Sequence, residues 1–270
     1  MKLLKLTLVE MRRALHRRIV RWMIFIAILC SAFAGVIVFL TSRDPVKFAQ
    51  DPGHPARMVN WWAPGGGDNY LTISALFRVV GAVICGASVA GAEWKAGTMT
   101  TMLTWVPSRI LLHSARTNSA AILSFVISFL LQVLFLAVAI PAVIFNGTTS
   151  RTDSSWWLAL LLAMLRISLI TMLVAVLAVS IATIGRNTSA ALIALATWAL
   201  VIERLLAGFW PKFARFMISE NVATVVSWSQ LTGVEFERPP IVALITLVGY
   251  LLFVVLIATI SFARRDVATT

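Results

Sequence analysis

The sequence predicts an all-α polytopic membrane protein with six transmembrane helices. Of its 270 residues, 60% are hydrophobic and only 13% are charged, and the mean hydropathy is +0.91. Soluble domains carry about 25% charged residues, so a globular cytosolic protein is excluded. The apolar residues gather in runs of about 20, the length that crosses a bilayer as a helix. The Lys and Arg residues collect at the ends of these runs.

The chain begins with a basic amphipathic segment, residues 1–21, that predicts an elbow helix on the membrane surface. Apolar residues recur there at helical spacing: Leu4, Leu8, Met11 and Leu15. A helix of this kind lies along an anionic leaflet before the chain enters the bilayer. A signal peptide is the alternative, because residues 32–34 offer a cleavage-like triplet. The apolar run continues past this triplet, however, and favours an uncleaved first span over residues 22–40.

Five more apolar runs predict the other spans of a single transmembrane domain, residues 22–265, with a short tail at 266–270. These runs cover residues 71–92, 120–145, 156–184, 190–206 and 241–262. Before the second run, Trp61, Trp62 and Tyr70 are interpreted as anchors at the membrane interface. Small residues in the second run predict close helix packing.

The segment before the sixth span predicts a short interfacial or re-entrant helix. Its aromatic and apolar residues fall on one helical face: Phe209, Phe213, Phe216 and Met217. Lys212 and Arg215 lie off that face, which is typical of a helix at a membrane surface.

The Lys and Arg residues set the orientation. Thirteen of the 23 lie in the N-terminal arm, the second and fourth connections and the C-terminal end, and seven lie on the other side. Because cytoplasmic loops are enriched in Lys and Arg, both termini are expected to face the cytoplasm. The even number of spans agrees with this expectation.

The connection between the second and third spans, residues 91–116, is the only long patterned polar segment on the basic side. It contains a short amphipathic helix whose apolar residues share one face: Met99, Met102, Leu103 and Val106. Pro107 ends that helix, since its ring fixes φ and it has no N–H to donate. A short helix with an adaptable Met-rich face is expected to press on another protein.

This segment resembles that of the permease subunits of ABC transporters, specifically the type-2 exporter class. In that family the second and third spans are joined by a Glu, a Gly-Thr step, a hydrophobic turn, a Pro and an Arg. The matching residues here are Glu93, Gly97, Thr98, Met102, Leu103, Pro107 and Arg109. The family often has a Lys shortly after that Arg, whereas this chain has Arg116.

The resemblance implies a permease of the bacterial plasma membrane, working as a homodimer or heterodimer of six-helix subunits. Two separate ATP-binding subunits would dock on the coupling residues, and ATP and Mg would be bound by those partners. An amphipathic peptide antibiotic, drug or lipid would be the substrate. Glu93 would hold the coupling segment against the spans through Lys95, Arg109 or Arg116. The alternative for Glu93 is an exposed acid that contributes little.

An enzyme is not expected, and a membrane-embedded enzyme that uses scattered residues is left as an alternative. The chain has no GxxxxGK[ST] loop and no GxSxG, and its three histidines lie far apart outside the spans, so no cofactor or metal site is predicted. A nucleic-acid partner is not expected either, because most basic residues flank apolar runs. A secondary transporter is the main alternative, and a membrane anchor or receptor for another complex is a third. A secondary transporter usually has an internal repeat and acids at mid-membrane.

Four charged residues lie within or at the end of the predicted spans: Arg78, Arg166, Glu203 and Arg204. An unpaired Arg facing lipid is costly. In one interpretation Arg166 or Arg78 pairs with Glu203 and fixes helix packing. In the other, these two arginines line the dimer cleft and attract anionic head groups or acidic groups of a substrate.

Overall fold

The computed structural model describes residues 2–54, 56–62, 70–150, 152–229 and 238–264, so the predicted tail at 266–270 lies outside the described residues. Within these ranges the chain consists of helices and their connections, with no strand. Six helices are long and apolar enough to cross a membrane. The predicted fold class, an all-α polytopic membrane protein, is therefore confirmed.

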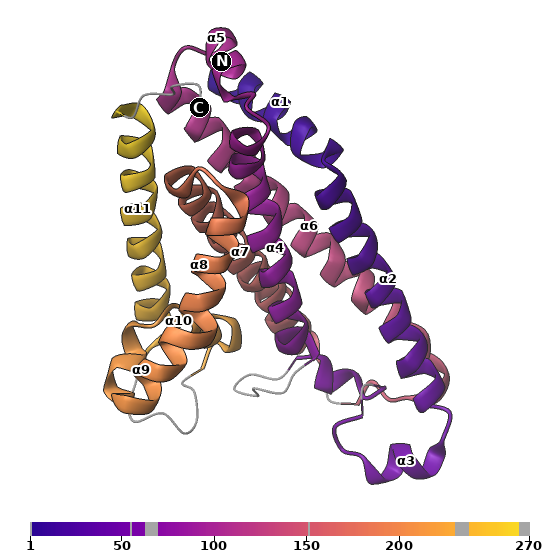
Figure 1. Cartoon of the computed structure of the whole chain (residues 1–270). Coiled ribbons are helices and arrows are strands. Elements are labelled where there is room, and N and C mark those ends of the chain that lie inside the picture. The colour runs from indigo at the N-terminus through magenta and orange to yellow at the C-terminus, as the bar shows by residue number, and fades with distance from the viewer. Residues whose placement is uncertain (1, 55, 63–69, 151, 230–237, 265–270) are drawn as a thin grey trace.

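The six spans are α2, α4, α6, α7, a composite of α8 and α9, and α11 (Figure 1). In chain order the α-helices are α1 (Lys2–His16), α2 (Arg18–Thr41), α3 (Pro45–Gln50), α4 (Tyr70–Lys95), α5 (Met99–Trp105), α6 (Arg109–Asn146), α7 (Ser154–Gly185), α8 (Thr188–Thr197), α9 (Glu203–Phe209), α10 (Ile218–Ser227) and α11 (Pro240–Arg264). A π-helical turn, Trp198–Ile202, joins α8 to α9, and two 3₁₀ turns are η1 (Met58–Trp61) and η3 (Pro211–Phe216).

Polar residues at the turns explain where the long helices begin. Ser108 before α6, Asp153 before α7 and Asn187 before α8 each accept a backbone N–H of the following first turn. These caps satisfy donors that have no partner inside the helix. The sequence therefore fixes where α6, α7 and α8 begin.

The helices α4 and α7 form the centre of the bundle (Figure 1), and α7 is the most buried span. They approach closely where Gly86 lies against the backbone of Ala175, and a Cβ added to Gly86 would lie 2.5 Å from the Ala175 carbonyl oxygen. Only glycine fits there. The expectation that small residues in this span allow close packing therefore holds at this crossing.

Two tryptophans in the connection before α4 are not interface anchors, contrary to the prediction. Trp61 and Trp62 are each 1% exposed and pack in the main core with residues of α7 and α10. Their indoles fill the space between spans, so that connection folds back into the bundle. Tyr70, in contrast, is only partly buried, and its hydroxyl donates to the Gly53 carbonyl.

The short helix before the sixth span is α10, and it lies deeper than the predicted aromatic face. Phe209, Phe213 and Phe216 are exposed and belong to α9 and η3, whereas Met217 is buried just before α10. Asn221 and Val225 of α10 are fully buried. The re-entrant part therefore begins after the aromatic row, which sits at the surface.

The start of α1, the helix α5 and the end of α11 lie together at one end of the molecule, and α3 and α9 lie at the other (Figure 1). An even number of spans requires this arrangement.

Candidate functional site

The candidate site is built around α5, the seven-residue helix between α4 and α6. Gly97, with φ of +66°, turns the chain out of α4 in the left-handed region that glycine adopts readily. Thr98 is the exposed N-cap of α5, and its N–H donates to the Glu93 carbonyl at 3.1 Å. Exposed Pro107 follows α5, and Ser108 then caps α6. The chain thus fixes both ends of α5.

The apolar face of α5 points into the protein, which corrects the expectation that it presses on another protein. Met99 is 2% exposed and packs with Leu112 of α6 and Phe262 of α11. Partly buried apolar residues pack against this cluster: Trp94, Met102, Leu103 and Val106. The outer face of α5 carries Thr101, Thr104 and Trp105, and Trp105 is 82% exposed. Any partner at α5 would therefore meet the Trp105 face.

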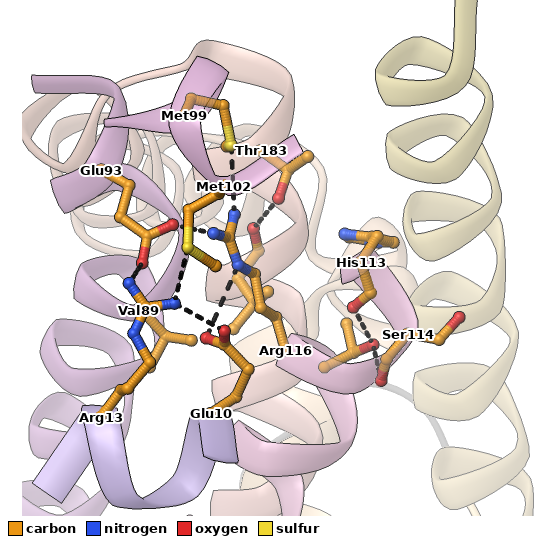
Figure 2. A network of polar contacts seen from close by, with 12 residues as sticks. Glu10, Arg13, Val89, Glu93, Met99, Met102, His113, Ser114, Arg116 and Thr183 are labelled. Carbon is orange, nitrogen blue, oxygen red and sulfur yellow. Dashed lines mark hydrogen bonds and ion pairs between the residues drawn. The ribbon is translucent and has the colours of Figure 1, made fainter. Parts of the chain in front are cut away.

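Five charged residues from α1, the α1–α2 junction, α4 and α6 meet beneath α5, and we call them the charge cluster. Its members are Glu10, Arg13, Arg17, Glu93 and Arg116. Figure 2 shows four of them facing one another below α5. With two acids and three arginines, the cluster carries one net positive charge.

Glu93 is the centre of the cluster. It is 5% exposed, so the alternative of an exposed acid is wrong. Its Oε1 lies 2.8 Å from Nη2 of Arg13 and 3.2 Å from Nη2 of Arg17, and its Oε2 pairs with Nη2 of Arg116. Of the three expected partners, Arg116 is in contact through its side chain, and Lys95 is exposed. One carboxylate therefore joins three guanidinium groups through charge-assisted contacts.

Arg109, the third expected partner, reaches a different element. Its Nη1 donates to the backbone carbonyl of Phe262 at 3.4 Å and so ties the start of α6 to the end of α11.

Glu10 closes the network from the other side. It is 1% exposed, its Oε1 accepts from Nη1 of Arg13 at 2.7 Å, and its Oε2 lies 3.8 Å from Nε of Arg116. Arg17 adds hydrogen bonds to the carbonyls of Ser88 and Val89 in α4. Burial lowers the pKa of the Arg17 guanidinium below its ordinary value, and the neighbouring Arg13 charge adds to this effect.

The methionines connect α5 to the charge cluster. Nη1 of Arg13 lies 3.2 Å from the Met102 sulfur, and Nη1 of Arg116 lies 3.8 Å from the Met99 sulfur. Figure 2 shows each sulfur atom facing the guanidinium group that it contacts. A displacement of α5 would therefore act directly on side chains held by α1, α4 and α6.

Glu203 does not pair with either intramembrane arginine, contrary to the first interpretation of those charges. It is 1% exposed and accepts the backbone N–H groups of Ile218 and Ser219 at 2.8 and 2.9 Å. The indole of Trp198 donates to the same carboxylate at 2.7 Å, across the π-helical turn. Glu203 therefore caps the N-terminus of α10, where a negative charge is favoured.

The two arginines have different environments. Arg78 donates within its own helix, to the Ser74 hydroxyl at 2.6 Å and the Leu71 carbonyl at 3.3 Å. Arg166 lies between two indole rings, with its Cζ 5.3 Å from the ring centre of Trp62 and 4.8 Å from that of Trp228. Among the described residues, neither guanidinium contacts Glu203.

Sequence reasoning missed the contribution of α1 to the site. The apolar residues Leu4 and Leu8 are exposed, while the side of α1 that meets the bundle carries Thr7, Glu10 and Ala14. The available signal was Glu10, the one acid among the first 21 residues. An acid placed alone in a basic helix is expected to face its cationic partners.

Comparison with family models and with curated proteins finds no match to this chain. Within the described ranges, no group of three or more His, Cys, Asp or Glu residues is placed to hold a metal ion.

Proposed function

We propose that this chain is the permease subunit of an ATP-driven exporter of the ABC type-2 class. The observation that supports this proposal is the position of α5, which lies at one end of a six-helix bundle and rests on Arg13 of α1, Trp94 of α4 and Arg116 of α6. A mobile partner that pushes on α5 would move three elements together. A membrane anchor has no need for such a connection.

In this mechanism two ATP-binding subunits dock at the α5 end, and they bind ATP and Mg. Their closure on ATP displaces α5, and the charge cluster carries the movement to α4 and α6. Because Glu93 shares its charge among three guanidinium groups, the cluster moves as one body. The chain itself needs no catalytic residue.

The permease would function in the bacterial plasma membrane, with both termini in the cytoplasm, beside a second permease that is identical or a sister chain. The path between the two subunits would carry an amphipathic peptide, drug or lipid. The excess of Lys and Arg on the side of the termini supports this orientation.

Trp105 provides the test. The chain is co-expressed with candidate ATP-binding subunits, and the complex that forms is purified and assayed for ATP hydrolysis in lipid nanodiscs. We expect Trp105→Asp to abolish co-purification and coupled hydrolysis, because a carboxylate buried in an apolar interface costs several kcal/mol. The wild-type expression level should be kept, since this side chain is 82% exposed.

Trp210→Asp is the matched control, because Trp210 is also exposed, at 59%, and follows α9 at the other end of the molecule. It should leave the complex and its hydrolysis intact. An intact, active complex with Trp105→Asp would refute docking at α5. Met102→Asp is a poorer test, because this side chain lies beside Arg13.

A further inference from the structure

Arg166 is a charged residue deep in a membrane span whose hydrogen-bonding capacity is unused. It lies about 18 Å along α7 from Ser154, at 1.5 Å per residue. Among the residues that the structure describes, it makes no hydrogen bond and no ion pair, and its Nε is buried without a partner. An intramembrane arginine in this state points to a functional site.

The guanidinium of Arg166 contacts two indole rings, those of Trp62 and Trp228. Both ring centres lie within about 6 Å of Cζ, the range of a cation–π contact. The five N–H donors of an arginine lie in the plane of the group and point outward from its edge. The indoles therefore hold Arg166 in place and use none of its donors.

Trp62 adds a second donor without an acceptor. Its side chain is buried, at 1% exposed, and its indole N–H has no partner among the described residues. Its own carbonyl accepts from the Trp156 indole at 2.9 Å, so the residue is fixed in place. A buried donor without an acceptor costs about 1–3 kcal/mol. An anionic group would give Arg166 and Trp62 the acceptors that they lack.

An apolar groove begins one turn further along the same side of α7. Ile170, Leu173 and Leu177 follow Arg166 at helical spacing and line this groove, together with residues of α10 and α11. The groove is shallow and open, with a cavity volume of only about 20 Å³. An alkyl chain beside the guanidinium would lie against these side chains.

We infer that Arg166, Trp62 and this groove bind an anionic amphiphile, with its carboxylate, phosphate or sulfate at Arg166 and its apolar tail between α7, α10 and α11. The same chemistry is found in an anionic phospholipid of the bilayer and in an amphipathic compound carried across it. That the second is the transported substrate rests on the proposed function. Binding itself needs no ATP-binding subunit and is measured without one.

The test is native mass spectrometry of the purified, delipidated full chain in a non-ionic detergent. The chain is titrated with dodecyl phosphate and with dodecyltrimethylammonium, which share a tail and differ in charge. We expect dodecyl phosphate to bind and the cation not to bind. Arg166→Gln should weaken dodecyl phosphate binding about tenfold or more, since hydrogen bonds to a charged group are lost.

Three further variants separate the binding site from general effects. Arg78→Gln is the matched control, because Arg78 already donates within its own helix, and it should change binding less than about twofold. Trp62→Phe removes the indole N–H and reduces the ring but keeps an aromatic face for Arg166, so a loss of about threefold is expected. Arg166→Lys keeps the charge but loses the planar fork, and it should bind with intermediate affinity even if Arg166→Gln misfolds.

A competition arm distinguishes the two sources of the ligand. If dioleoylphosphatidylglycerol binds and displaces dodecyl phosphate, and this displacement depends on Arg166, the site holds a bilayer lipid. If only the single-chain compound binds, the site takes a free amphiphile. Equal binding of both dodecyl compounds, or unchanged affinity in Arg166→Gln, overturns the inference. Such a failure would leave docking at α5 untouched.

Discussion

The charge cluster and the Arg166 site are both sets of buried polar side chains, but they use their donors differently. In the charge cluster every arginine has a carboxylate partner, and Glu93 alone contacts three of them. At Arg166 two indole rings hold the guanidinium while its N–H groups have no acceptor among the described residues. In the first arrangement the charges are paired within the chain, whereas Arg166 has no charged partner among the described residues.

This difference indicates what a substitution should do at each place. Removing one charge from a complete buried network leaves its partners desolvated and unpaired, which is strongly destabilising. Removing a group that lacks a partner takes away an existing cost together with a modest contact. Stability should therefore respond to the charge cluster, and ligand binding to Arg166.

The largest effect is expected from Glu93→Gln. This change leaves three arginines with only Glu10, and Arg116 is itself 2% exposed. Stability in detergent should fall by about 3 kcal/mol, the loss typical when a buried ion pair is broken. Differential scanning fluorimetry of the purified chain measures it. In the exporter, transport should fall further than assembly.

Glu220→Gln is the control for that loss, because Glu220 is only partly buried and pairs with an exposed arginine at 3.8 Å. It should cost less than about 1 kcal/mol. Adding Arg116→Leu to Glu93→Gln should restore much of the stability, since one acid then faces two arginines. If the double variant is as unstable as Glu93→Gln alone, the electrostatic account of the charge cluster is wrong.

Hydropathy and breaker residues were enough to predict the spans and α5. The apolar runs carry the membrane signal themselves, and Gly97 and Pro107 delimit α5 by their own backbone properties. The direction of the Met-rich face was not predictable in the same way. Its spacing shows that Met99 and Met102 share a side, but it does not show whether α11 or another protein covers that side.

The partners of the buried charges were harder to predict, because they depend on contacts distant in the sequence. Glu203 accepts two backbone N–H groups 15 and 16 residues away. Nothing in the sequence pattern shows that this carboxylate binds backbone N–H groups and not a cationic side chain. The expectation of an arginine partner considered side-chain charges alone. Glu10 was passed over because the apolar stripe of α1 dominates its pattern.

An intermediate effect on stability is expected from Glu203→Leu. Like the charge cluster, Glu203 has its partners within the chain, but two of them are backbone N–H groups. The substitution removes the acceptor for two N–H groups of α10 and for the Trp198 indole, so stability should fall by about 1–2 kcal/mol. Hydrogen–deuterium exchange should rise at the first turn of α10 and remain unchanged in α5. A uniform rise across both helices would indicate global loosening and contradict a local cap.

The smallest effect on stability is expected from Arg166→Leu. The substitution loses two cation–π contacts, but it also removes a guanidinium whose N–H groups have no acceptor, and the two changes offset each other to within about 1 kcal/mol. Because Glu203 is bound to α10 and not to Arg166, adding Glu203→Gln should give no rescue. Scanning fluorimetry of both single variants and the double variant measures this. A large loss in Arg166→Leu that Glu203→Gln repairs would mean that the two charges are coupled, and the contrast between a complete cluster and an open site would then fail.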